Sequence, residues 1–92
     1  MKWVEVIMLQ VAGRNREAVQ QKISGLISEI GPNGGIERTI LYRHAMTGNG
    51  LSVHLQWESE QAEPRGSAAG LSLCNALAEY GLVSHAVWIE GR

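Results

Sequence analysis

The sequence predicts an α+β fold with the element order β-α-β-β-α-β, and three observations lead to it. Residues 51–58 alternate strictly between apolar and polar side chains, which is typical of a strand with one buried face. Two stretches, one between Asn15 and Gly31 and one from 67 to 80, carry apolar residues at helical spacing. Two further strand-like stretches, 3–12 and 84–90, lie near the two ends of the chain. This order is the split βαβ, or ferredoxin-like, arrangement, in which two helices cover one face of a four-stranded antiparallel sheet.

The first strand, 3–12, is apolar on both faces and is interrupted only by Glu5. A strand that is covered on both sides is normally central, so we expect this one in the middle of the sheet. Gly13-Arg14-Asn15 breaks the pattern, and Asn15 is a suitable N-cap for the first helix. Gly31-Pro32 is expected to end that helix, because glycine tolerates the left-handed cap and proline cannot continue it.

A second strand, 36–46, precedes the alternating strand, and Gly48-Asn49-Gly50 supplies the turn of a hairpin. The length of the loop decides which side chains share a face. A loop of two or four residues places Ile40, Tyr42, His44 and Met46 with Val53, Leu55 and Trp57. The same loop places Leu41, Arg43 and Ala45 with His54 and Gln56. A loop of odd length reverses this pairing.

The remaining elements follow in order. Residues 59–66 are polar, contain Pro64 and form a connecting loop. The second helix runs from about Ser67 to Tyr80, and Gly81 is expected to cap its end. Its inner face is predicted to contain Gly70, Leu73, Cys74, Leu77 and Tyr80. In the last strand, 84–90, His85, Val87 and Ile89 lie opposite Ala86 and Trp88.

Composition limits the class of protein. A chain of 92 residues predicts a single domain, 1–92. The net charge of -1 provides no general attraction for nucleic acid or an anionic membrane. Cys74 is the only cysteine, so no internal disulfide can form, and no apolar run approaches the ~20 residues of a membrane span. We therefore expect a soluble, cytoplasmic protein that binds neither nucleic acid nor membrane.

Because both helices lie on one side, the other face of the sheet is predicted to be open. Its expected apolar residues are Trp3, Ile7, Leu9, Leu41 and Trp88. A soluble monomer rarely exposes so large an apolar patch. Covering several hundred Å² at about 25 cal/mol per Å² gives several kcal/mol, so we expect a homodimer in which two open faces meet. The alternative is a monomer whose scattered surface apolar residues need no explanation.

The polar residues of the open face suggest weak acid–base chemistry. Arg43, His54, Gln56 and Glu58 are predicted to project to one side, and a histidine beside a carboxylate can transfer protons near neutral pH. A solvated sheet face, or polar contacts in a dimer, is the simpler interpretation. No metal site is predicted, because the alternation of side chains along the strands places His54 on one face of the sheet and His44 and His85 on the other. Arg65 and Ser67 precede the second helix, whose N-terminus could hold an anion, although Ser67 as an ordinary N-cap is the simpler interpretation.

A resemblance to a known family rests on Trp57-Glu58-Ser59-Glu60-Gln61-Ala62. A tryptophan that ends the third strand, followed by an acidic and small-residue run into the second helix, resembles the antibiotic-biosynthesis-monooxygenase family of the dimeric α+β barrel superfamily. The resemblance implies a homodimer with a pocket between sheet and helices that oxidises a quinone-like or aromatic compound, or handles haem in some relatives. The chain departs from the family where Pro64-Arg65-Gly66 stands in place of a histidine of many relatives, and it contains no phenylalanine.

These observations leave two functions open. The first is a monooxygenase-like enzyme that needs no cofactor, with His54 and Trp57 as candidate catalytic residues and a pocket lined by Tyr42, His54, Trp57 and Trp88. The second is a non-catalytic module that binds a small ligand or another protein. The candidate ligand-binding residues are Tyr42, Arg43, Gln56, Arg65, Ser67 and Trp88. An RNA-binding sheet is set aside, because its central strands lack paired exposed aromatic and basic residues.

Overall fold

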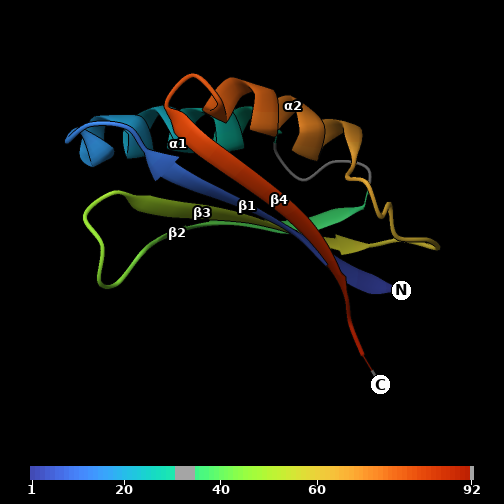
Figure 1. Ribbon diagram of the computed structural model, residues 1–92. Helices are drawn as coiled ribbons and strands as arrows, with labels where there is room; N and C mark the ends of the chain where they lie inside the picture. Colours follow the sequence, from blue (N-terminus) through green and yellow to red (C-terminus); the bar gives the residue numbers. More distant parts are fainter. Residues whose placement is uncertain (31–34, 92) are drawn as a thin grey trace.

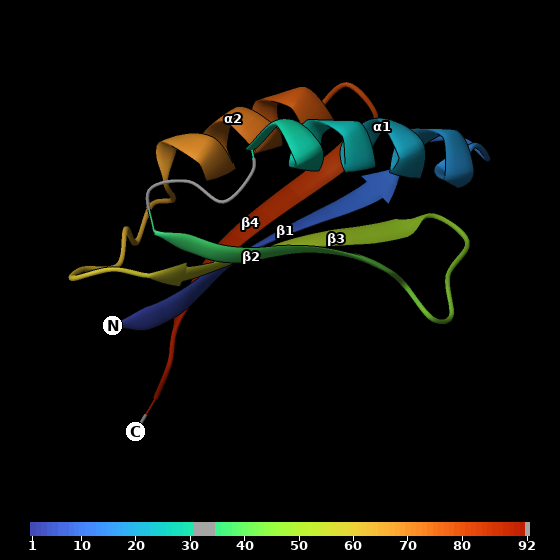
Figure 2. The same cartoon turned by 180° about the vertical axis from the view of Figure 1, so that it is seen from behind.

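The computed structural model describes residues 1–30 and 35–91 and has the predicted ferredoxin-like order. The elements are β1 (Lys2–Val11), α1 (Arg16–Ile30), β2 (Ile36–Arg43), β3 (Gly50–Glu58), α2 (Ala68–Leu77) and β4 (Gly81–Ile89). The four strands form one antiparallel sheet in the order β2-β3-β1-β4, so β1 and β3 are central as expected. Both helices lie on the same side of the sheet, and none of the described residues forms an element over the other side (Figures 1 and 2). No helix within the described ranges is long and apolar enough to cross a membrane.

The pairing of β1 with its two neighbours fixes the two faces of the sheet. Trp3 lies opposite Trp57 of β3 and opposite Ile89 of β4. Side chains alternate along each strand, so the odd-numbered residues of β1, β3 and β4 share the face beneath the helices. We call this the covered face. The buried core is made of its residues Trp3, Ile7, Leu9, Val11, Leu51, Val53, Leu55 and Trp57, together with Ile36, Val19 and Ile23 of α1 and Leu73 and Leu77 of α2.

The prediction that Trp3, Ile7 and Leu9 belong to the open face is wrong. All three are at most 4% exposed and pack beneath the helices. Apolar side chains occupy both faces of β1, so the alternation of residues alone did not show which face lies beneath the helices. The charged residue that shares their face, Glu5, is fully buried and has two polar partners there, Ser67 directly before α2 and His85 on β4.

The expected register of β2 against β3 is also wrong, and the odd-length alternative is correct. Tyr42 pairs with Ser52, and Arg43 pairs with Leu51, so residues 44–50 form a loop of odd length. Ile40 and Tyr42 therefore lie on the open face, whereas Leu41 and Arg43 point to the other side. β2 stops at Arg43 instead of continuing to Met46, because His44 organises the loop.

His44 lies in this loop and not on the helix side of a strand. Its Nδ1 accepts the backbone N–H groups of Met46 and Thr47, both at 3.0 Å, and its own N–H donates to the carbonyl of Gly50. The side chain is exposed. The expectation that His44 shares a strand face with Val53, Leu55 and Trp57 is therefore wrong.

The helix boundaries agree with the predictions at their N-terminal ends. α1 begins directly after Asn15, whose carbonyl accepts the N–H of Val19, and α2 begins directly after Ser67. The predicted end of the first helix at Gly31-Pro32 lies outside the described residues. α2 ends at Leu77, and Gly81 opens β4 instead of capping the helix. A side chain at Gly81 would collide with the carbonyl of Gln10, since its Cβ would lie 2.0 Å from that oxygen.

Candidate functional site

A cleft of about 550 Å³ opens at one end of the molecule, between the sheet and the facing ends of the two helices. We call it the end cleft. Strand starts and ends form its floor, the end of α1 and the start of α2 form its walls, and the 59–63 loop forms its rim. Its lining includes Trp3, Ile30, Ile36, Trp57, Ser59 and Ser67. The pocket between sheet and helices that the family resemblance implies is therefore present.

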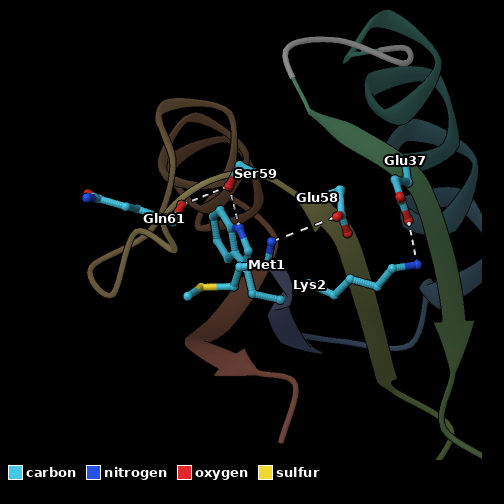
Figure 3. A network of polar contacts seen from close by, with 7 residues as sticks. Met1, Lys2, Glu37, Glu58, Ser59 and Gln61 are labelled. Atoms are coloured by element: carbon cyan, nitrogen blue, oxygen red, sulfur yellow. Dashed lines mark hydrogen bonds and ion pairs between the residues drawn. The ribbon is translucent and has the colours of Figure 1, made fainter. Parts of the chain in front are cut away.

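Two tryptophans on neighbouring strands form the aromatic floor of the end cleft. The rings of Trp3 and Trp57 stack with centroids 5.0 Å apart and planes 6° from parallel. The Trp3 Nε1–H donates to Ser59 Oγ at 2.8 Å, and the Ser59 hydroxyl donates to the carbonyl of Gln61. Figure 3 shows Ser59 and Gln61 at this end of the sheet, beside the exposed ion pairs Met1–Glu58 and Lys2–Glu37. The contact with Ser59 fixes the orientation of the Trp3 ring.

The second indole N–H differs from the first. Trp57 is 9% exposed, and its Nε1 is buried without a hydrogen-bond partner in the part of the chain that the structure describes. A buried donor that lacks an acceptor costs about 1–3 kcal/mol, so an acceptor atom of a ligand beside this nitrogen would recover that cost. Trp57, a candidate catalytic residue of the sequence analysis, therefore carries an unused hydrogen-bond donor, which a ligand acceptor reaches only by displacing the atoms that cover it.

A buried polar cluster lies behind the wall of the end cleft, between β1, β4 and the start of α2. Glu5 is fully buried, and its Oε1 accepts the hydroxyl hydrogen of Ser67. The Oε2 atom of Glu5 lies 2.8 Å from Nε2 of His85 on β4. Ser67 also caps α2, since its Oγ accepts the N–H of Gly70 at 2.9 Å. The carboxyl group of Glu5 thus lies at the N-terminal end of α2, the positive end of the helix dipole.

Two glycines make room for this cluster. A Cβ at Gly70 would lie 1.9 Å from Oε2 of Glu5, and a Cβ at Gly66 would lie 2.3 Å from Cε1 of His85. Gly66 also has a φ of 100°, which side-chain-bearing residues rarely adopt. The loop and the first turn of α2 can therefore approach the carboxylate and the imidazole only because both positions lack a side chain. The anion position suggested for the start of this helix is filled by Glu5 itself.

Four of the sequence-predicted site residues lie on the open face, away from the end cleft. Tyr42, His54, Gln56 and Trp88 share this face, and the rings of Tyr42 and His54 are in contact with centroids 4.7 Å apart. Burial lowers the pKa of His54 below its ordinary value. A second cleft, of about 480 Å³, is lined by His54, Trp57 and Trp88 together with Trp3 and Gln56. Three of the four residues of the predicted pocket therefore share a cleft, and Tyr42 lies outside it.

The two arginines named as candidates are separate from these groups. Arg43 is exposed at the hairpin end of β2 and points away from the face of His54, so the expected alignment of Arg43 with His54 and Gln56 is wrong. Arg65 is exposed in the loop before α2, two residues from Ser67. Of the predicted residues, Trp57 and Ser67 alone line the end cleft.

Sequence reasoning did not identify Glu5 and His85 as members of a site. One signal was available for Glu5, because a single charged residue in an otherwise apolar central strand needs a buried partner. For His85 the inward direction was predicted correctly, but its partner lies 80 residues away in the sequence. Within the described ranges, no group of three or more His, Cys, Asp or Glu residues could hold a metal ion.

The lone cysteine also lies near this cluster. Cys74 on α2 is partly buried and free. Burial raises the pKa of its thiol, and the charge of Glu5 raises it further. The thiolate is therefore disfavoured, which makes Cys74 a poor nucleophile.

Comparison with known proteins shows a shared fold. No protein-family model matches the sequence, and no curated protein matches it significantly. The structure of Rv0793 from Mycobacterium tuberculosis matches with a TM-score of 0.73 and 20% identity, over 100% of this chain and 97% of that chain. A variant of SnoaB, a cofactor-independent oxygenase from Streptomyces nogalater, matches with a TM-score of 0.76 and 16% identity, over 99% and 94%.

A third match connects the fold to a bound ligand. The monooxygenase ActVA-Orf6 of Streptomyces coelicolor, solved in complex with nanaomycin D, matches with a TM-score of 0.63 and 22% identity, over 98% of this chain and 88% of that chain. These full-length matches confirm that the chain resembles antibiotic-biosynthesis monooxygenases in fold. Its activity is a separate question, since one fold can carry many functions.

Proposed function

We propose that this protein is a monooxygenase-like enzyme that binds a planar, quinone-like or aromatic compound in the end cleft. The observation that carries the proposal is the buried Nε1–H of Trp57, which has no partner among the described residues, beside the stacked ring of Trp3. The indole surfaces favour a flat aromatic ligand, and the N–H group favours an oxygen atom on that ligand. The fold shared with SnoaB and ActVA-Orf6, described as an oxygenase and a monooxygenase, supports the same class of reaction.

In the simplest reaction of this class, dioxygen converts a ring CH₂ group beside the aromatic system into a C=O group. One oxygen atom enters the product, the other leaves as water, and the substrate supplies all four electrons. The protein residues then have three tasks: to hold the ring, to exclude water and to stabilise the electron-rich anion that reacts with dioxygen. Trp57 Nε1–H serves the third task by donating to the oxygen on which that anion carries its charge.

We also propose that the protein acts as a homodimer through its open face. Four large apolar residues of that face are substantially exposed: Met8 53%, Tyr42 44%, Leu82 75% and Trp88 64%. They come from β1, β2 and β4, so the exposed apolar surface crosses the whole sheet. The patch differs in composition from the predicted one but supports the same homodimer.

A non-catalytic, ligand-binding module is the second candidate, and one observation favours it. Among the described residues that line the end cleft, none is a histidine, cysteine or lysine. The charged residues at its edge, Glu29 and Glu63, are exposed. A cleft of this composition can hold an aromatic ligand without reacting with it.

Anthrone distinguishes the two candidates, because its oxidation by dioxygen gives anthraquinone and water. The enzyme should produce anthraquinone faster than buffer alone, and anthrone should quench tryptophan fluorescence. Trp57→Phe keeps an aromatic ring but removes the N–H donor, so we expect it to slow oxidation about tenfold, the effect of about 1.4 kcal/mol. Tyr80→Phe, outside the end cleft, serves as the control and should leave the rate unchanged.

The other outcomes decide against the enzyme. Quenching without oxidation would favour the ligand-binding module. The absence of both quenching and oxidation would contradict both candidates for the end cleft.

A further inference from the structure

The proposed reaction requires a group that removes a proton from the substrate, and the walls of the end cleft do not supply one directly. Anthrone, for example, becomes an electron-rich anion when its CH₂ group loses a proton or when its phenolic tautomer loses the hydroxyl proton, and both routes give the same anion. Groups that can accept a proton are present in the buried cluster of Glu5, Ser67 and His85 behind the wall of the cleft. Ser67 belongs to both places, because it lines the end cleft and donates its hydroxyl hydrogen to Glu5.

Ser67 still has one hydrogen-bonding position to offer. A serine hydroxyl has one hydrogen and two acceptor lone pairs. Its hydrogen points to Glu5 Oε1, and the N–H of Gly70 occupies one lone pair at 2.9 Å. The described residues leave the second lone pair unoccupied. Ser67 lines the end cleft but is only 3% exposed, so a ligand hydroxyl can donate to this lone pair only when it packs directly against Ser67.

The far end of the cluster reaches the surface. Glu5 Oε2 lies 2.8 Å from His85 Nε2, and the side chain of His85 is 17% exposed while that of Glu5 is fully buried. Imidazole is the side chain that takes up and releases protons near neutral pH. His85 can therefore exchange protons with solvent on behalf of a carboxylate that has no contact with water.

We propose that Ser67, Glu5 and His85 form a proton relay that carries the proton of a phenolic hydroxyl from the end cleft to solvent. The ligand hydroxyl gives its proton to Ser67 Oγ as Ser67 passes its own to Glu5 Oε1. The imidazolium form of His85 then releases the proton on Nδ1 to solvent, which leaves Glu5 and His85 both neutral and the number of protons held by the cluster unchanged. The starting state returns when the proton on Glu5 goes back through Ser67 to the oxygen atom that leaves as water, and His85 takes up a proton from solvent. The ligand is left as a phenolate beside the Nε1–H of Trp57.

This inference rests on the proposed function and makes it more specific, since it selects ligands that carry a phenolic hydroxyl. Ser67 is the residue that touches the ligand. Glu5 and His85 act through Ser67 and are positioning residues. Close packing at Gly66 and Gly70 holds all three in line, because any side chain at either glycine would overlap the His85 ring or the Glu5 carboxylate.

The test is the pH dependence of anthrone oxidation in wild type, Glu5→Gln and His85→Gln, each corrected for the rate in buffer. At pH 7 both variants should be slower by about a hundredfold, the usual contribution of a proton-transfer group. At a pH high enough to ionise the phenolic tautomer in solution, the variants should recover to within about twofold of wild type. A merely structural role for the cluster predicts an equal loss at every pH.

Each outcome is decisive. Recovery at high pH supports the relay, and a pH-independent loss or no loss at all overturns it while the proposed function stands. Wild type that oxidises no anthrone overturns the proposed function and the relay together. If Glu5→Gln does not fold, His85→Gln and Ser67→Asn carry the test, because asparagine can still cap α2 but has no hydroxyl to pass a proton.

Discussion

The two faces of the sheet carry polar residues for different purposes. On the covered face the polar group is a single carboxylate, Glu5, which is fully buried and held by Ser67 and His85. On the open face, His54 and its neighbours are partly exposed, and Tyr42 is the side chain whose ring contacts His54. A polar residue costs little at a surface but requires partners in a core. The covered face therefore holds the hydrogen-bonded cluster of Glu5, Ser67 and His85, and the open face holds a surface suited to another protein chain.

The largest test of this difference replaces one leucine on each face. Leu55→Ala opens a cavity at a fully buried position, so we expect the free energy of unfolding to fall by about 3 kcal/mol. Leu82→Ala on the open face, where the side chain is 75% exposed, should cost less than about 0.5 kcal/mol. Urea denaturation at concentrations where the chain is monomeric measures both values. Equal losses would show that the open face is packed in the monomer as well.

The second test adds a methyl group on each helix. Gly70→Ala forces a Cβ to within 1.9 Å of the Glu5 carboxylate, so we expect a loss of about 2 kcal/mol despite the better helix propensity of alanine. Gly25→Ala on α1 meets nothing within 4 Å and should stabilise the protein by about 0.5–1 kcal/mol. The same denaturation experiment measures both changes. A stabilising Gly70→Ala would mean that the cluster moves easily, and the relay geometry would then lack support.

The strand pattern explains which parts of this picture could be predicted from the sequence. The strict alternation of β3 placed His54 and Trp57 on opposite faces correctly, because one of its faces is apolar and the other polar. In β1 both faces are apolar. Which set of alternate residues faces the helices therefore depends on where Glu5 finds hydrogen-bond partners. Those partners come from α2 and β4, which are distant in sequence, and local pattern carries no information about such contacts.

Loop parity caused the other error. A single residue more or less between β2 and β3 moves every side chain of β2 to the opposite face. The hydrogen bonds of His44 to Met46 and Thr47 set that length, and the glycine-rich turn alone does not specify it. The existence of the pocket was implied by the family resemblance. Its acid–base cluster, by contrast, became visible only in three dimensions.

The third test addresses the open face directly. Trp88→Lys places a charge in the middle of the exposed apolar patch without touching the core, since this side chain is 64% exposed. If two open faces meet, burying that charge should weaken the dimer at least tenfold. Light scattering across a concentration series measures the change, and Lys22→Ala on the outer side of α1 is a control with no expected effect. A wild-type chain that stays monomeric at high concentration would contradict the proposed homodimer.

The smallest effect concerns pH and His54. Burial lowers the pKa of His54 in the folded chain below the ordinary value of 6.5, so the unfolded chain binds the proton first as the pH falls. The free energy of unfolding should therefore decrease as the pH drops through 6.5 toward the lowered pKa, and should not depend on His54 at higher pH, where both states are neutral. His54→Gln should remove this part of the pH dependence, whereas Ser52→Ala on the same face should retain it. The difference between wild type and His54→Gln in urea midpoint from pH 8 to 5 measures the effect. A dimer would enlarge it, because a second open face removes more water from the imidazole. A slope that grows with protein concentration would therefore place His54 at the interface.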